Sequence, residues 1–393
     1  MLDLARCPEF LKPRLRIYLS ADIIGSTAQK QSKLGALEPN GQPNDPSWFT
    51  TIQGFYFEAQ QSVREAWDGL ADDLGEGHHL GEVPTLWKTV GDEVLFTKLV
   101  SDHRQVLATV RCWMTALNGM REFLRREGNG RLGVKSTVWL AEFPIRNKEV
   151  VLSGDSFSQS GPIGDYFAEN GRILNDFYSG KSDKINIDYI GPSIDTGFRL
   201  TTQASARKLI ISVEVAYILA MAPRLANQIV VPVDMRYDGE IHLKGVMGGA
   251  GYPLFWIDLS VEDSAAVLGD RLSGQGKCDR DLVSDFCRAF FQEKEDFISP
   301  PFIISDEEKV LTHTPEWYEE RLQNLIKWFE NPQDEAAEIE VAEKAASSSA
   351  ALGDPNFQEN WQAFRDRLDR LALAAHKSFE GGSAVVNQSP DLE

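Results

Sequence analysis

The feature that most constrains the fold is an apolar run that ends in a carboxylate. Residues 15–21 (LRIYLSA) are rich in branched and aromatic side chains, which is typical of a buried strand. Asp22 follows directly, and a turn through Gly25, Ser26 and Thr27 then leads into a helical pattern. This order predicts a carboxylate at a strand tip, beside a helix N-terminus whose backbone N–H groups can bind an anion.

Helical and strand patterns alternate along most of the chain. A Gly91-Asp92 turn inside residues 86–96 is typical of a tight β-hairpin. The spacing of apolar residues predicts helices at 49–74, 103–126 and 194–206, a long strand at 131–143, and β-like runs at 239–246 and 252–259. Gly-, Pro-, Asn- and Ser-rich composition predicts irregular loops at 35–48 and 153–171. The expected fold class is α/β, of the α+β type.

The composition changes near residue 260. A chain of 393 residues exceeds what one hydrophobic core usually holds, so a second region is expected. We place the boundary near 262, between a domain at 1–262 and a mostly helical C-terminal region at 263–393. Helices are expected at 281–293, 316–329 and 358–376, a linker at 333–353, and a disordered tail from about 380.

The charge balance restricts the partners. The chain has 59 acidic and 40 basic residues, a formal net charge of -19, which repels nucleic acid and the anionic face of a membrane. We therefore expect neither as a partner. An anionic ligand could bind only where metal ions, backbone N–H groups or a few cations offset this charge.

The cysteines and the N-terminus indicate a cytoplasmic protein. Four cysteines without a C-x-x-C spacing fit neither a disulfide framework nor a zinc knuckle, so a reducing compartment is expected. The first twenty residues mix acids, bases and a proline and lack the apolar region of a secretory signal. The most apolar stretch, 209–223, contains Glu214 and is too short to span a bilayer.

Two carboxylates on neighbouring strand tips suggest a metal site. Asp22 ends the first strand and Asp92 lies at the tip of the hairpin. Such a pair could share two divalent ions, as two-metal phosphoryl transfer requires. Either residue could instead be an ordinary turn or N-cap aspartate.

The wider motif set resembles the class III nucleotidyl cyclases. Its other members are Lys88, Asp188, Asp195 and Arg199. The resemblance covers roughly residues 14–259 and implies a ferredoxin-like βαββαβ core. It also implies two Mn²⁺ or Mg²⁺ ions per site, bound by the two aspartates and a backbone carbonyl.

The resemblance implies a role for each matching residue. Lys88 and Asp188 would face the base, whereas Asp195 and Arg199 would orient the ribose and stabilise the transition state. Lys244, in a closing strand, would reach the triphosphate. The remaining implied ligands are in the first loop: the carbonyl of Ile23 for the metal, and Ile23, Gly25, Ser26 and Thr27 for the substrate.

Two positions depart from the family pattern. Asp195 replaces the usual asparagine, and an ionised aspartate can accept but not donate a hydrogen bond. Ser26 stands where an aromatic residue is usual. Asp195 and Arg199 are four residues apart, so on a helix they could also form a simple surface ion pair.

A narrower resemblance is to the pyrimidine cyclases of bacterial Pycsar anti-phage systems. It rests on residues 189–199 and 137–144, including the aspartate in place of asparagine. It implies cyclic UMP or cyclic CMP as product, a separate effector activated by that product, and a homodimer with composite sites. The metal aspartates would come from one protomer, and Lys88, Asp188, Asp195 and Arg199 from the other.

Several readings remain open. UTP is the expected substrate, with CTP or ATP as alternatives, and a catalytically silent nucleotide-binding sensor is a further one. A group of aromatic residues could fill the space of the missing purine ring or belong to the core: Trp48, Phe49, Phe55, Tyr56 and Phe57. His78-His79 is interpreted as a solvated loop, and the Gly-rich run 245–251 as a hairpin turn.

Overall fold

The computed structural model describes residues 4, 7–31, 47–74, 80–152, 166–182, 185–225, 233–260, 265–274, 276–307 and 309–330. Met1–Ile326 form one compact unit. Lys327–Glu393 form a second unit, of which only residues 327–330 are described. The predicted helix at 358–376, the linker at 333–353 and the tail lie outside the described residues.

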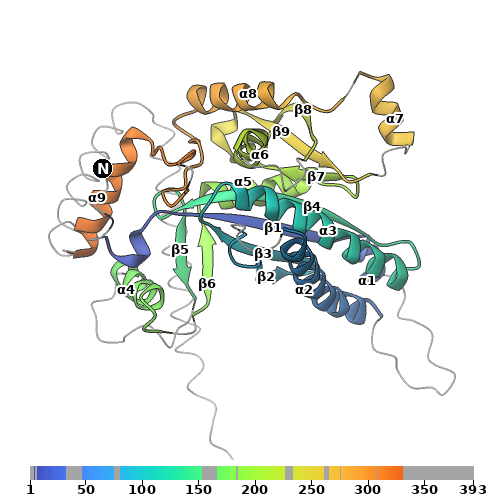
Figure 1. The fold of residues 1–393 in the computed structure, drawn as a ribbon. Coiled ribbons are helices and arrows are strands. Elements are labelled where there is room, and N and C mark those ends of the chain that lie inside the picture. Colours follow the sequence, from blue (N-terminus) through green and yellow to red (C-terminus); the bar gives the residue numbers. More distant parts are fainter. Residues whose placement is uncertain are drawn as a thin grey trace, which may run out of the picture. The chain divides into compact units, whose positions relative to one another are not determined.

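A seven-stranded mixed sheet forms the centre of the first unit (Figure 1). Its strand order is β2-β3-β1-β4-β7-β9-β8, and all neighbours are antiparallel except β4 and β7. Its strands are β1 Arg14–Ile24, β2 Thr85–Val90, β3 Glu93–Val100, β4 Gly133–Phe143, β7 Lys208–Ile211, β8 Met235–His242 and β9 Gly251–Asp258. A separate pair joins β5 Lys148–Val151 to β6 Ile187–Ile190.

Helices cover both faces of this sheet. The helices are α1 Ser26–Gln31, α2 Ser47–Leu74, α3 Arg104–Glu127, α4 Tyr166–Tyr178, α5 Pro192–Leu200, α6 Val213–Leu225, α7 Ala265–Leu272, α8 Arg280–Glu293 and α9 Glu316–Glu330. The described residues also contain the 3₁₀ turns η1 Glu9–Leu11, η3 Thr201–Gln203 and η4 Met247–Gly249. Among the described residues, no helix is both long enough and apolar enough to cross a membrane.

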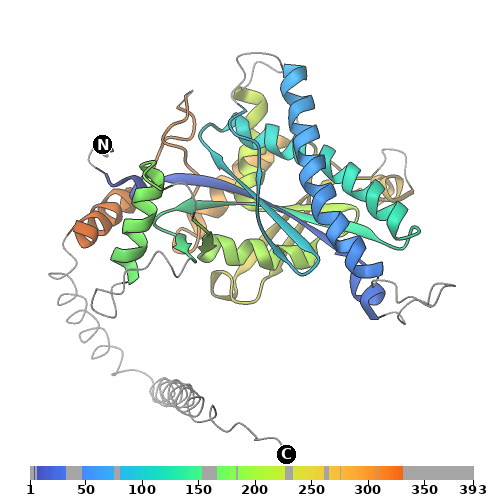
Figure 2. The same ribbon diagram turned by 90° about the horizontal axis from the view of Figure 1, so that it is seen from below.

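The alternation of side chains along β1 explains the two layers. Leu15, Ile17 and Leu19 belong to the main core with α2, α3 and α6, whereas Tyr18 joins the smaller cluster under α5. The neighbouring helices α2 and α3 lie on the main-core face (Figure 2). Because both faces are covered, β1 is buried without a break over residues 17–21, which confirms the buried strand predicted from the run at 15–21.

The connectivity confirms the expected fold class. The elements β1, α2, β2, β3, α3 and β4 follow one another, and their strands lie in the order β2-β3-β1-β4. This is the antiparallel βαββαβ arrangement of a ferredoxin-like core, extended by β7, β9 and β8. The hairpin at Gly91-Asp92 and the helices expected at 49–74, 103–126, 281–293 and 316–329 are also confirmed.

Three sequence predictions were wrong in their bounds. The loop predicted at 153–171 gives way to α4 at Tyr166, because Ile173 and Leu174 bury an apolar side of that helix. The helix predicted at 194–206 starts at Pro192 and ends at Leu200, followed by η3. The strand predicted at 239–246 ends at His242.

Helix α8 of the C-terminal region is part of the main core. α8 packs on α6 (Figure 1) and contributes Cys287, Phe290 and Phe291 to the same buried cluster as β1. The position near residue 262 therefore falls inside the first compact unit. The domain boundary stays a prediction from composition.

A buried hydrogen bond fixes the start of α9 to the sheet. Tyr318 is fully buried, and its hydroxyl donates to Glu142 Oε1 of β4 at 2.7 Å. Burial raises the pKa of Glu142, and the hydrogen bonds from Tyr318 and the Arg146 N–H offset only part of this effect.

We expect Tyr318→Phe to lower the free energy of unfolding by about 1–3 kcal/mol, because it leaves a buried acceptor without its donor. Urea denaturation followed by circular dichroism measures this loss. Tyr237→Phe is the matched control, because Tyr237 is 38% exposed and its hydroxyl has no hydrogen bond among the described residues. Equal stability of the two variants would contradict the role given to the Tyr318 hydroxyl.

Candidate functional site

The tips of β1 and the β2–β3 hairpin bring two predicted metal ligands together. Asp22 lies opposite Glu93 in the register of β1 and β3, and Asp92 occupies the hairpin turn. The Ile23 N–H donates to the Asp92 carbonyl oxygen at 3.4 Å. Asp22 and Asp92 therefore lie on adjacent strand ends, as predicted.

Each of these carboxylates is paired with a lysine. Lys135 Nζ lies 3.0 Å from Asp22 Oδ2, and Lys30 Nζ lies 2.8 Å from Asp92 Oδ1. Burial alone would raise the pKa of Asp92, but the hydrogen bonds from Lys30 and Ser26 outweigh it and lower this pKa. Asp92 therefore stays ionised near neutral pH.

The donor set fits a hard divalent cation. Asp22 and Asp92 offer carboxylate oxygens, the ligand type that Mg²⁺ prefers and that Mn²⁺ accepts. Their side chains are 24% and 21% exposed, so solvent and an ion can reach them. The two lysine contacts mark positions where positive charge is already favourable.

A third carboxylate, Glu93, was missed in the sequence analysis. It lies opposite Asp22, and its Oε1 accepts a hydrogen bond from Ser20 Oγ at 2.5 Å. Burial raises the pKa of Glu93, and the negative charges of Asp22 and Asp92 raise it further. The hairpin register could have identified it, since the residue after Gly91-Asp92 faces the end of the first strand.

The first loop folds Ser26 inward. Gly25 has φ +90°, and a Cβ there would lie 3.0 Å from the Arg131 carbonyl oxygen, so glycine is required. Ser26 is 3% exposed and its hydroxyl donates to Asp92 Oδ2. A small hydroxyl side chain suits this position, which accounts for the missing aromatic. Thr27 remains exposed in the first turn of α1.

The two predicted base-facing residues meet directly. Lys88 Nζ lies 2.6 Å from Asp188 Oδ1, although the residues are 100 positions apart. Asp188 Oδ1 also accepts from the Tyr189 N–H at 3.0 Å. Strands β2 and β6 therefore place a cation and a carboxylate side by side, both partly exposed.

Helix α5 presents the two predicted catalytic residues to solvent. Gly197 packs against Trp139 of β4 so closely that any Cβ would overlap the indole ring. Asp195 and Arg199 are exposed, and neither side chain has a hydrogen bond or ion pair within the described part of the chain. The alternative of a surface ion pair between them is therefore not realised.

The prediction that Lys244 lies on the closing strand was wrong. β8 ends at His242 because the chain turns there, and Lys244 is exposed in the turn that follows. This turn still lies beside α5. Asp195 and Thr196 line a cavity of about 360 Å³ together with Gly245 and Val246.

The five aromatic residues around the start of α2 have different environments. Phe55 is fully buried in the core, whereas Phe49 and Phe57 are 49% and 65% exposed. Tyr56 is half-buried, and its hydroxyl donates to the Gly91 carbonyl oxygen in the hairpin turn. Core packing thus explains Phe55, and Trp48 and Tyr56 pack partly buried against the same core, whereas Phe49 and Phe57 are not explained by it. Tyr56 also supports the Asp92 turn.

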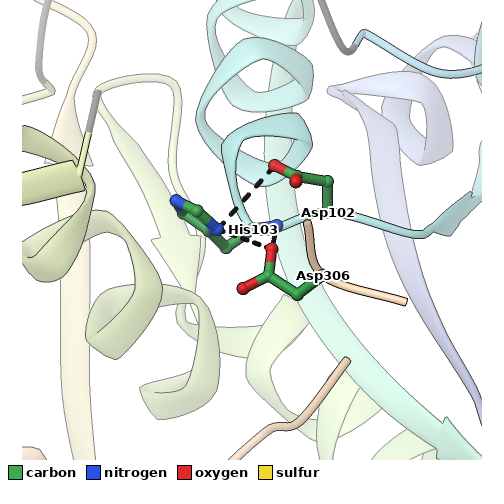
Figure 3. Close-up of side chains that lie close together, drawn as sticks. All are labelled: Asp102, His103 and Asp306. Atoms are coloured by element: carbon green, nitrogen blue, oxygen red, sulfur yellow. Dashed lines mark hydrogen bonds and ion pairs between the residues drawn. The ribbon is translucent and has the colours of Figure 1, made fainter. Parts of the chain in front are cut away.

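A second group of candidate metal ligands lies at the other end of β3: Asp102, His103 and Asp306 (Figure 3). His103 Nδ1 lies 2.7 Å from Asp306 Oδ1 and 3.7 Å from Asp102 Oδ1. All three side chains are almost fully buried. His103 Nε2 points away from the carboxylates.

Hydrogen-bond donors already occupy these carboxylates. Burial would raise the pKa of Asp102, but hydrogen bonds from the Arg104 side chain and N–H lower it to about 2. Asp306 Oδ2 accepts from the N–H groups of residues 310 and 311 at 2.9 and 3.2 Å. The group is therefore best explained as a clamp that ties residues 306–311 to the start of α3.

The chain is similar in structure to nucleotide cyclase domains. No family model matches it, and no curated protein matches it. The adenylyl cyclase CyaB from P. aeruginosa is 12% identical with a TM-score of 0.42, covering 65% of this chain and 98% of that chain. The guanylate cyclase domain of RhGC from Catenaria anguillulae, in complex with GTP, is 10% identical with a TM-score of 0.39, covering 63% and 97%.

Proposed function

We propose that the chain is a pyrimidine nucleotide cyclase that converts UTP into 3′,5′-cyclic UMP and pyrophosphate. One observation carries this proposal. The fold brings Asp22 next to the Asp92 turn and joins Lys88 to Asp188 from distant parts of the sequence, and these two pairs would serve as complementary half-sites. The second half-site adjoins α5, which exposes Asp195 and Arg199 without partners in the described residues.

Asp22 and Asp92, with the backbone carbonyl of Ile23, would hold two Mg²⁺ or Mn²⁺ ions. Such ions supply Lewis-acid chemistry that activates a hydroxyl and neutralises phosphate charge. Ser26 and Lys30 keep Asp92 ionised and fixed for this task. Gly25, Ser26 and Thr27 would approach the phosphates as the substrate loop.

Arg199 would stabilise the charge that develops on the reacting phosphate. Its guanidinium is permanently charged, presents a planar fork to phosphate oxygens, and has no competing carboxylate among the described residues. Asp195 would accept a hydrogen bond from a ribose hydroxyl. Lys244, exposed in the turn after β8, would bind the triphosphate.

The proposed assembly is a cytoplasmic homodimer with composite sites. Asp22 and Asp92 of one protomer would face Lys88, Asp188 and the α5 residues of its partner, and the exposure of α5 is compatible with this. The product would activate a separate effector in a Pycsar-type antiviral defence. Neither nucleic acid nor a membrane is a proposed partner.

The alternatives to a uridylate cyclase are a cyclase for ATP, a cyclase for CTP, and a catalytically silent sensor. The Lys88–Asp188 pair could also meet the edge of adenine, as an adenylate cyclase requires, and cytosine offers a similar edge. Asp195 in place of asparagine favours a catalytically silent nucleotide sensor.

The products formed from an equimolar mixture of the four nucleoside triphosphates decide between these readings. With purified full-length protein and Mn²⁺ or Mg²⁺, we expect cyclic UMP to dominate in mass spectrometry. Cyclic CMP or cyclic AMP in excess would replace the uridylate assignment. No cyclic product with either metal would overturn the enzyme proposal, and tight nucleotide binding unaffected by Arg199→Ala would support the sensor.

A further inference from the structure

We infer that the site selects its base by ring size, through an aromatic wall formed by Trp87 and Phe198, and not through the Lys88–Asp188 pair. This inference rests on the proposed function and names what makes it specific for a single-ring base. Trp87 lies outside the motifs found in the sequence, and Phe198 lies within the string 189–199 but was given no role there.

The Lys88–Asp188 pair alone cannot choose a base. After bonding Asp188 Oδ1, the Lys88 ammonium keeps N–H donors to offer, and Asp188 Oδ2 has no partner among the described residues. The pair therefore presents an N–H donor of Lys88 beside the acceptor oxygen Asp188 Oδ2. Uracil (O4 and N3–H), cytosine (N3 and N4–H), adenine (N1 and N6–H) and guanine (O6 and N1–H) each offer the complementary set.

The aromatic wall lies against Lys88 on the side of α5. Lys88 Nζ lies 4.1 Å from the centre of the Trp87 ring and 5.8 Å from that of Phe198. The two rings are 6.4 Å apart. The ammonium is thus held by a carboxylate and two ring faces, which limits how far it can move to suit a larger base.

Trp87 is fixed in place. Its Nε1–H donates to the Ile187 carbonyl oxygen at 3.2 Å, next to Asp188 in β6. Its ring also packs edge-on against Tyr18 and Tyr189, at centroid distances of 5.3 and 5.1 Å. The ring therefore cannot turn aside without breaking contacts with two strands.

In the proposed pose, Phe198 would lie beside the base. It is the residue before Arg199 on α5 and packs 5.8 Å from Trp139 beneath it. A nucleoside with its ribose at Asp195 and Arg199 and its base at Lys88 and Asp188 would lie along Phe198, because Phe198 adjoins Arg199 in sequence and its ring contacts Lys88. In this pose the phenyl ring would take the space of a second base ring and would offer its nitrogens no hydrogen bond.

Phe198→Ser tests the wall, because it removes the ring and keeps a small polar residue. We expect the ratio of kcat/KM for ATP to that for UTP to rise by about 10-fold or more. Phe198→Leu, which keeps an apolar contact with Trp139, should raise this ratio less. Phe123→Ser is the matched control: Phe123 is also half-buried, on α3 at the opposite sheet face, and the ratio should not change.

Binding of 3′-deoxy-UTP and 3′-deoxy-ATP gives a readout without turnover, since neither can cyclise. Calorimetry should show preference for the uridine analogue in the wild type and its loss in Phe198→Ser. If the wild type cyclises UTP and both Phe198 variants keep the wild-type ratio and preference, the wall inference is wrong and the proposed function stands. If no triphosphate is cyclised but the binding preference depends on Phe198, the proposed function fails and the wall stands.

Discussion

Replacing Asp22 by asparagine is expected to lower the rate of cyclic-nucleotide formation by about 10³-fold or more. Asparagine keeps the size of the side chain but removes the charge that would hold a divalent ion and that now pairs with Lys135 at 3.0 Å. Initial rates of cyclic UMP release at saturating Mn²⁺ measure the loss. The number of Mn²⁺ ions bound per chain, counted by electron paramagnetic resonance, should fall with it.

Asp68→Asn controls for the loss of one negative charge, because Asp68 is exposed on α2. This variant should keep wild-type activity and Mn²⁺ binding. Removing the metal with EDTA should abolish turnover of the wild type in the same assay. A rate for Asp22→Asn within tenfold of wild type would refute the assignment of this carboxylate to the metal.

Arg199→Ala is expected to reduce turnover by about 10³-fold, the usual effect of losing an arginine that stabilises phosphoryl transfer. The side chain is exposed and has no partner among the described residues, so its removal should leave the folded structure intact. Arg199→Lys should recover little, because an ammonium lacks the planar fork. Thermal unfolding temperatures equal to that of the wild type would show that the variants lose catalysis and not stability.

Mixing two inactive variants tests the composite sites. Co-expressed Asp22→Asn and Arg199→Ala chains should recover about a quarter of wild-type activity, because half of random dimers are mixed and carry one intact site of two. Each variant expressed alone should remain inactive. No recovery, despite mixed dimers seen by native mass spectrometry, would place Asp22 and Arg199 in the same protomer's site.

The sequence predicted those features of the site that depend on local patterns of residues. Asp22 and Asp92 could be placed at adjacent strand tips because an apolar run and a Gly-Asp turn each have a clear signature. Lys88 and Asp188 could be paired only through a resemblance, since no local rule joins residues 100 positions apart. Glu93 was missed although the hairpin register points to it.

The errors arise where tertiary packing decides. Lys244 was placed on a strand because residues 239–246 are β-like, but the chain leaves the sheet at His242. Trp87 and Phe198 were not identified because their meeting depends on how α5 lies on β4, which periodicity does not reveal. The spacing of Asp195 and Arg199 left a surface ion pair open as an alternative, and the structure does not form it.

The contacts made by Asp306 and Tyr318 have a consequence for biosynthesis. His103 and Glu142 are synthesised early, but their buried partners come 203 and 176 residues later. Phe290 of α8 likewise arrives late to complete the core. The first unit therefore cannot finish folding on the ribosome until residue 318 has emerged, and a prematurely terminated chain would expose apolar surface that chaperones and proteases recognise.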